Sequence, residues 1–200
     1  MIFHIKAWHR ILNDLGADLT MDEVKEQCYG KNGELLERIF PGRFSEEEKN
    51  SMSIEKEKAY QEAFRPLLKL LPGLDHFLQR AHDAGIAMAI GSAAIQFNID
   101  FVLDGLRIRN YFPVVVSAEQ VAISKPHPET YLSCADQLNI RYANCIVFED
   151  APKGVEAAQN AGMDCVVLTT MHTKEEFLQY TNIRCFVSDF KDAQLNALFQ

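Results

Sequence analysis

Between residues 86 and 187, short apolar segments alternate with segments of helical pattern, and this alternation constrains the fold more than any other feature of the sequence. Such alternation requires crossover connections between strands, which are right-handed and bring the strands together in parallel. It therefore predicts a Rossmann-like α/β core with a mainly parallel sheet buried on both faces. The predicted strands are 86–90, 113–117, 145–149, 165–169 and 184–187, and helices are predicted over 95–106, 128–138 and 154–161.

The first third of the chain has a helical pattern and is rich in charged residues. Apolar residues recur at helix spacing over 5–15, which places Trp8 in a predicted core. Thr20 and Glu23 have the spacing of a capping box that begins a second helix. Two more helices are expected over 33–40 and 45–64, and the second is polar enough to be expected in solvent. No strand pattern occurs before about residue 85.

A turn separates this helical part from the alternating part. Leu71-Pro72-Gly73 is a turn pattern, and an amphipathic helix follows over 74–84. The expected division is a helical unit at 1–66 and a Rossmann-like core at 67–200, with a hinge over 65–73. A length of 200 residues suits one domain with a small additional unit, and argues against a second full-sized domain.

The charge balance limits the classes of partner. The formal net charge is −8, whereas adhesion to nucleic acid or to an anionic membrane needs a clustered basic surface. We therefore expect no nucleic acid and no membrane partner. An anionic substrate would have to be held by a local positive site.

The cysteines favour a reduced, cytoplasmic setting. They form no CxxC pair and no His/Cys ligand spacing, and two of them lie in predicted strands. The first ten residues have no signal-peptide pattern, and no stretch of about eighteen apolar residues occurs. The chain is therefore expected to be soluble and not secreted. The five cysteines are at positions 28, 134, 145, 165 and 185.

Polar residues follow three of the predicted strands. Ligands of open parallel sheets bind beyond the carboxyl ends of the strands, so these residues are the candidates for a site. Ser92, in Gly91-Ser92, offers a hydroxyl and nearby amides to an anion. Lys125 offers one positive charge suited to a phosphoryl group, and Glu149 and Asp150 offer oxygen ligands to Mg²⁺.

Each of these residues also has a structural reading. Ser92 could be an ordinary helix N-cap, Lys125 a solvated surface lysine, and Asp150 the cap of the helix that follows it. A single short motif cannot separate these alternatives.

The order of the three motifs resembles the haloacid dehalogenase superfamily of phosphotransferases. Ser92 matches its second motif, Lys125 its third, and Glu149-Asp150 its fourth. The stretches SKPHPETYL and VFEDAPKGVEAAQNAGM resemble the subgroup of beta-phosphoglucomutase and related sugar-phosphate phosphatases. The segment around His4 is similar to the one that enters the subgroup's helical cap, and Lys31 and Asn32 lie in a segment similar to its cap loop.

The resemblance implies an Mg²⁺-dependent phosphohydrolase or phosphomutase that acts on a small phosphorylated metabolite, such as a sugar phosphate. In the family, phosphoryl transfer passes through an aspartyl-phosphate, and a second aspartate acts as general acid and base. Ser92 and Lys125 would be catalytic residues that hold phosphoryl oxygens, and Glu149 and Asp150 would hold the metal. His4, Lys31 and Asn32 would contact substrate from the cap, although His4 could equally pack between helices.

The family's first motif has no counterpart in this sequence, because no Asp-x-Asp pattern occurs in the 200 residues. In this fold the first-motif strand is central, so its absence would leave a gap of about 9 to 10 Å between its neighbours. We expect a truncation or a start codon assigned too late, and an inactive chain as written. The alternative is a non-catalytic protein that binds a phosphorylated ligand or a partner. The substrate, the choice between phosphatase and mutase, and the oligomeric state stay open.

Overall fold

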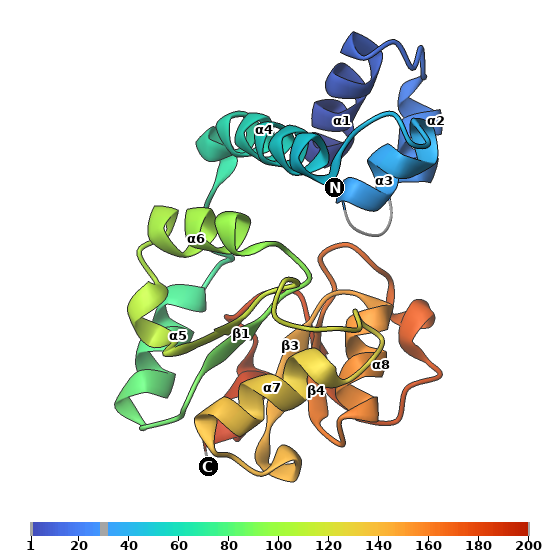
Figure 1. Ribbon diagram of the computed structural model, residues 1–200. Helices are drawn as coiled ribbons and strands as arrows, with labels where there is room; N and C mark the ends of the chain where they lie inside the picture. Colours follow the sequence, from blue (N-terminus) through green and yellow to red (C-terminus); the bar gives the residue numbers. More distant parts are fainter. Residues whose placement is uncertain (1, 29–31, 200) are drawn as a thin grey trace. The chain divides into compact units, whose positions relative to one another are not determined.

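The computed structural model describes residues 2–28 and 32–199, which form two compact units. Unit 1 is Met1–Leu68 and unit 2 is Lys69–Gln200. Figure 1 shows the helices of unit 1 in blue to cyan and the α/β elements of unit 2 in green to red. The expected combination of a helical cap with a Rossmann-like core is confirmed as the fold class.

Unit 1 consists of helices packed around a small apolar core. Trp8 is 2% exposed in this core, as its place on the apolar face predicted. The capping box at Thr20 and Glu23 is present, and Ser45 and Glu48 form a second one at the start of α4. The elements are α1 (Ile2–Asp14), α2 (Met21–Gln27), α3 (Asn32–Ile39), α4 (Glu46–Phe64) and the short 3-10 helix η1 (Arg65–Leu67).

Helix α4 is solvated along much of its surface, as its composition predicted, but it also has a buried face. It packs against α1 and α3 through this face, which carries charged and polar side chains. Composition did not predict this buried face, because the burial of its side chains follows from the polar partners that the other helices supply. The buried residues of α4 are Lys49, Lys56, Glu57 and Gln61.

The described part of unit 2 has five parallel strands with helices between them. All three strand pairings are parallel, which confirms the Rossmann-like core. The helices are α5 (Leu74–Asp83), α6 (Gln96–Gly105), α7 (Glu129–Leu138) and α8 (Pro152–Asn160). The strands are β1 (Ala89–Gly91), β2 (Val114–Val116), β3 (Ile146–Glu149), β4 (Asp164–Leu168) and β5 (Ile183–Val187). The 3-10 helices are η2 (Arg109–Tyr111), η3 (Tyr142–Asn144), η4 (Lys174–Phe177) and η5 (Ala193–Phe199).

Strand β1 begins three residues later than its apolar pattern predicted. The amide of Ile86 donates a hydrogen bond to the carbonyl of Ala81, so Ile86 still belongs to the turn that ends α5. The Ile86 residue is also 43% exposed. The turn before α5 matches its prediction: Gly73 has a φ of 79°, and a Cβ at this position would meet the backbone of Phe190.

The strands of unit 2 form two separate sheets. One contains β1 and β2, and the other contains β3, β4 and β5 in that order. Within the described residues, β1 and β3 therefore each have one edge that pairs with no strand, which agrees with the expected lack of a central strand between them. Figure 1 shows α7 (yellow) beside these sheets, and α7 contacts β1, β2 and α8.

Apolar side chains hold the two sheets in one unit. Val155 and Cys165, both fully buried, belong to the core between α8 and the larger sheet. Phe77 of α5 lies 5.2 Å from Phe148 of β3, measured between ring centroids, and so links a helix beside the small sheet to the larger sheet. All five cysteines are free thiols. None of the described helices is both long and apolar enough to cross a bilayer.

Candidate functional site

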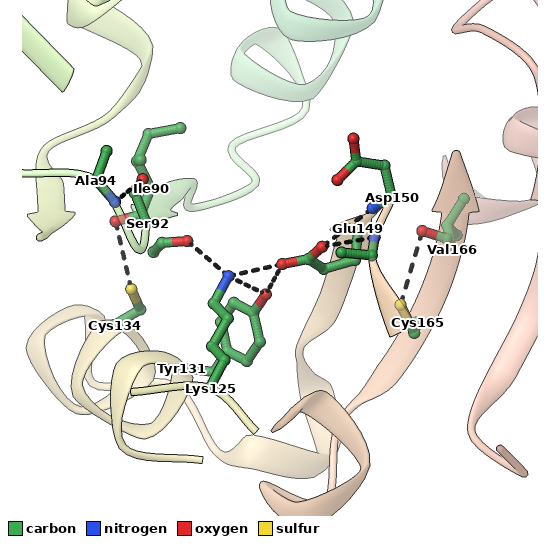
Figure 2. Close-up of polar contacts among 12 residues, drawn as sticks. Ile90, Ser92, Ala94, Lys125, Tyr131, Cys134, Glu149, Asp150, Cys165 and Val166 are labelled. Atoms are coloured by element: carbon green, nitrogen blue, oxygen red, sulfur yellow. Dashed lines mark hydrogen bonds and ion pairs between the residues drawn. The ribbon is translucent and has the colours of Figure 1, made fainter. Parts of the chain in front are cut away.

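Three of the four residues expected at strand ends do lie where strands of unit 2 end. Strand β1 ends at Gly91 just before Ser92, and β3 ends at Glu149 just before Asp150. Lys125 lies in the loop between β2 and α7. Figure 2 shows the Lys125 ammonium between the turn at Ser92 and the Glu149 carboxylate. Because Lys125 also donates to the carbonyl of Gly91 at the end of β1, its loop bridges the two sheets.

The Lys125 ammonium is held by three oxygens. Its Nζ lies 2.6 Å from Oε1 of Glu149, 2.7 Å from the hydroxyl of Tyr131 and 3.3 Å from the carbonyl oxygen of Gly91. The same Nζ lies 4.5 Å from the centroid of the Tyr131 ring. The alternative of a solvated surface lysine is therefore wrong, since the Lys125 side chain is only 13% exposed.

Tyr131 is a residue of this site that the sequence did not reveal. It lies on the buried face of α7, where an aromatic residue is read as core. Its hydroxyl donates to Oε1 of Glu149 at 2.5 Å. Burial, and then the nearby Glu149 carboxylate, raise the pKa of Tyr131, so the phenol stays protonated. Its spacing from Lys125 within SKPHPETYL was the only available signal, and it has no established meaning by itself.

Backbone amides also hold the Glu149 carboxylate in place. Its Oε2 accepts hydrogen bonds from the amides of Asp150 at 3.0 Å and Ala151 at 3.2 Å. A Cβ on Gly154 would overlap the Glu149 carboxyl group, so only glycine lets α8 approach this closely. Burial opposes ionisation, but Lys125 and the hydrogen bonds outweigh it and lower the pKa of Glu149.

The carboxylate of Asp150 accepts fewer hydrogen bonds than that of Glu149. Oδ2 accepts a hydrogen bond from the hydroxyl of Thr170 at 3.3 Å, and Asp150 as a whole is half-buried. The alternative that Asp150 caps the next helix is wrong: Ala151 is the N-cap of α8, which has no side-chain cap. Asp150 is thus available to a ligand.

Ser92 lies in a tight turn after β1. Its Oγ accepts a hydrogen bond from the amide of Ala94 at 3.0 Å, and its own amide donates to the carbonyl of Val116. Ile95 is the N-cap of α6, so the reading of Ser92 as an ordinary helix cap is wrong. Among the described residues its hydroxyl proton has no acceptor, which leaves it as a donor for a ligand.

The carboxylates of this site meet the needs of a divalent cation only in part. In the described ranges, no group of three or more His, Cys, Asp or Glu side chains could hold a metal ion. Mg²⁺ needs fewer protein oxygens than this, because it keeps several waters and takes substrate oxygens. Asp150 fits this requirement directly. Glu149 fits it only when one of the partners of Oε1 withdraws.

In unit 1, His4 and Asn32 belong to a buried polar cluster with Lys56 and Glu57. The Lys56 Nζ lies 2.7 Å from His4 Nδ1 and 2.7 Å from Glu57 Oε1, and the Asn32 side-chain amide donates to the same Glu57 oxygen at 2.8 Å. His4 stacks on Tyr60 at 3.8 Å between ring centroids. Lys31 lies outside the described residues.

Burial has the largest effect on the protonation of this cluster. It lowers the pKa of His4 to about 4, and the nearby positive charge of Lys56 lowers the same pKa to a smaller extent. Burial also lowers the pKa of Lys56, although Glu57 opposes this change. Lys56 and Glu57 were missed because charged residues on a polar helix are usually solvated.

Comparison with known proteins identifies a family and several relatives of this chain. The profile of the family "haloacid dehalogenase-like hydrolase" matches residues 2–168. The chain is 28% identical over 163 residues to the fructose-1-phosphate phosphatase YqaB of Escherichia coli (strain K12), covering 82% of this chain and 86% of that protein. It is 35% identical over 119 residues to a phosphorylated carbohydrates phosphatase of Thermotoga maritima, covering 58% and 55%.

Solved structures share the fold. The beta-phosphoglucomutase of Clostridium difficile superposes with a TM-score of 0.77 at 26% identity, covering 98% of this chain and 87% of that one. This likeness extends over both units of the chain.

Proposed function

We propose that this chain, which belongs to the haloacid dehalogenase-like hydrolases, provides the phosphate- and metal-binding residues of a phosphatase or phosphomutase for a sugar phosphate. The observation that carries the proposal is the contact of Lys125 with Glu149 beside the open Asp150 carboxylate. It puts one cation and two carboxylates at the carboxyl ends of parallel strands, where ligands of such sheets bind.

Lys125 and Ser92 act on the phosphoryl group. The Lys125 ammonium supplies a positive charge to the phosphoryl oxygens, and the Ser92 hydroxyl supplies a hydrogen-bond donor. The turn at Ser92 positions its hydroxyl in advance, whereas the Lys125 ammonium must leave Oε1 of Glu149 to engage the phosphoryl group fully.

Asp150 would hold Mg²⁺. Glu149 would become a second ligand once Lys125 or Tyr131 no longer occupies its Oε1 oxygen. The cation, when bound, neutralises charge on the phosphoryl oxygens. The role of the protein is to orient these oxygen ligands: the amides of Asp150 and Ala151 fix Oε2 of Glu149, and Thr170 fixes Oδ2 of Asp150.

Unit 1 is proposed as the cap that selects the substrate. His4 and Asn32, together with Lys31, would contact the sugar or its distal groups. The support is that His4 is 29% exposed while its ring is held by Lys56 and Tyr60, so it presents a fixed polar group. The printed names of the relatives, a fructose-1-phosphate phosphatase and a phosphorylated carbohydrates phosphatase, support a small phosphorylated metabolite as the substrate.

The chain as written is proposed to be inactive. No residue in its sequence matches the family's aspartate nucleophile or its acid/base partner, since no Asp-x-Asp pattern is present. This observation also favours a second candidate function, a non-catalytic protein that binds a phosphorylated ligand or a partner at Lys125.

One assay separates the two functions. The chain as written and a form extended upstream in frame are each given Mg²⁺ and a panel of sugar phosphates, and phosphate release and isomer formation are measured. We expect turnover only in the extended form. If the extended form is folded and inactive, the binding function is correct and the enzymatic one is wrong.

Substitution of Asp150 tests the metal role in the same extended form. Asp150→Ala is expected to abolish the Mg²⁺-dependent rate, and Asp83→Ala, which removes an exposed carboxylate at the end of α5, is expected to leave it unchanged. An unchanged rate in Asp150→Ala would remove Asp150 from the metal site. Lys125→Ala is expected to be as damaging as Asp150→Ala, whereas Lys31→Ala should alter substrate preference more than the chemical step.

A further inference from the structure

The acceptor positions of the Glu149 carboxylate are all in use. A carboxylate offers about four lone-pair positions, two on each oxygen. Oε1 accepts from Lys125 and Tyr131, and Oε2 accepts from the amides of Asp150 and Ala151. A cation that binds Glu149 must therefore displace one of these four donors.

The two donors on Oε2 are part of the backbone and cannot leave without unfolding the start of α8. The carboxyl group also lies directly against Gly154, so it cannot shift toward α8. Only the two side chains on Oε1 can move. Of these, Tyr131 is anchored by its buried ring at 7% exposure, whereas Lys125 ends a flexible four-carbon chain.

The Tyr131 hydroxyl forms hydrogen bonds with both Glu149 and Lys125. Its phenol proton goes to Glu149, and its oxygen accepts from the Lys125 ammonium, so the three groups form a closed ring of hydrogen bonds. Loss of the hydroxyl would free one acceptor position on Oε1 without changing any charge in the site. That property makes Tyr131 a more discriminating test position than either charged residue.

We propose that Tyr131 is a positioning residue that, with Lys125, keeps Glu149 closed to a divalent cation until an anion draws Lys125 away. The inference rests on the proposed function, because it takes Asp150 and Glu149 as the cation ligands. Anion and cation binding are then coupled through Lys125, and the coupling is reciprocal by thermodynamic linkage.

The primary test is Mn²⁺ binding to the 200-residue chain, measured by electron paramagnetic resonance without phosphate. Tyr131→Phe keeps the ring and its packing, and we expect it to bind Mn²⁺ about fivefold more tightly than the wild type, the equivalent of one hydrogen bond. Tyr142→Phe is the matched control, since the Tyr142 hydroxyl also donates to a carboxylate, that of Asp136, outside the site. It should bind as the wild type does. Equal or weaker binding in Tyr131→Phe overturns the inference.

Inorganic phosphate gives a second signature that a merely structural role would not produce. With saturating phosphate, Lys125 has left Oε1 in the wild type as well, so Tyr131→Phe should no longer bind Mn²⁺ more tightly than the wild type. If Tyr131→Phe still binds Mn²⁺ about fivefold more tightly, the proposed coupling is contradicted. Far-UV circular dichroism confirms that each variant is folded.

A measurement on the wild type alone keeps the inference testable if a variant does not fold. The ammonium nitrogen of Lys125, followed by ¹⁵N nuclear magnetic resonance, should shift when inorganic phosphate is added without metal. An unmoved signal means that the anion does not draw Lys125 away, and the inference is wrong.

Asp150→Asn separates this inference from the proposed function. If Mn²⁺ binding requires Asp150 but is the same in Tyr131→Phe and the wild type, only the inference fails. If neither the wild type nor any variant binds Mn²⁺, both fail.

Discussion

Among the described residues, two lysine–glutamate pairs have both side chains largely buried, one pair in each unit, and they are built in opposite ways. In unit 2, Lys125 lies in the loop after β2 and Glu149 ends β3, 24 residues later, and their side chains are 13% and 11% exposed. In unit 1, Lys56 and Glu57 are consecutive on α4, and their side chains are 4% and 5% exposed. Each pair has further polar partners, Tyr131 in the first case and His4 with Asn32 in the second.

The difference lies in what supports the charges. Glu149 receives two backbone amides, and its pKa falls below the ordinary value despite burial. Lys56 depends on side chains alone among the contacts described, and burial lowers its pKa. Backbone donors are fixed before any ligand arrives, whereas side-chain partners must themselves be ordered. Because backbone amides keep Glu149 in place, this carboxylate can exchange Lys125 for another partner. The Lys56–Glu57 pair instead links side chains of different helices and is suited to hold these helices together.

The largest expected effect comes from removing one carboxylate from each pair. Glu57→Ala leaves Lys56 buried without its carboxylate, so we expect unit 1 to lose about 3 to 5 kcal/mol of unfolding free energy. Glu149→Ala should cost unit 2 less, about 1 to 3 kcal/mol, because Lys125 keeps Tyr131 and the Gly91 carbonyl.

Urea unfolding measures both changes. Trp8 is the one tryptophan of the sequence, so its fluorescence reports unit 1, and circular dichroism follows the whole chain. Glu55→Ala, at an exposed position of α4, is the matched control and should change little. Equal losses from Glu57→Ala and Glu149→Ala would remove the distinction between the pairs.

A glycine substitution tests whether Glu149 is held by its backbone support. Gly154→Ala places a methyl group where the Glu149 carboxyl group lies, and we expect a loss of about 1 to 3 kcal/mol in unit 2. Gly33→Ala is the matched control on α3, where a Cβ meets nothing within 4 Å, and it should stabilise unit 1 by up to about 1 kcal/mol. Thermal unfolding gives both values. Unchanged stability in Gly154→Ala would show that the carboxylate can move aside.

The smallest expected effect is a pH dependence of unit 1. Unfolded His4 takes up a proton near its ordinary pKa of 6.5, but folded His4 does so only near a pKa of about 4. Between these values the unfolded state binds more protons, so stability falls as the pH is lowered from 6.5 to 4. Because His4 is partly exposed, we expect only about 1 to 2 kcal/mol.

Trp8 fluorescence during urea unfolding at several pH values checks this expectation. His4→Phe retains an aromatic ring against Tyr60 and should abolish the dependence, whereas His9→Gln, on the same helix, should retain it. The Glu149 pair behaves differently: its stabilising contribution is present above the ordinary glutamate pKa and is lost as the pH falls through the lowered pKa. The same pH profile in both variants would assign the dependence to another group.

The sequence predicted the parts of this fold that depend on local pattern. Strands β2 to β5 lie within a residue or two of their apolar segments, because β-branched and apolar runs between turns leave few alternatives. The rule that parallel strands end at the same edge grouped Lys125 and Glu149 in one candidate site, but their direct contact was not predicted. The roles of these residues in catalysis and metal binding stay predictions.

The sequence did not predict the features that depend on tertiary contacts. Lys56 is buried because His4 reaches it from 52 positions away, and no local pattern of α4 records that partner. Tyr131 was hidden for a related reason: its ring packs as core, and only the fold reveals that its hydroxyl faces two charged groups. In both cases the missing information was a long-range polar contact.

The unpaired edges of β1 and β3 bear on how the isolated chain behaves in solution. An open strand edge presents backbone donors and acceptors that can pair with an extended segment of another molecule. Apolar residues such as Val147 and Phe148 of β3 add to this tendency, because they also favour stacked sheets. The solubility of the chain should therefore fall steeply with concentration, and aggregates that form should be rich in intermolecular β-structure.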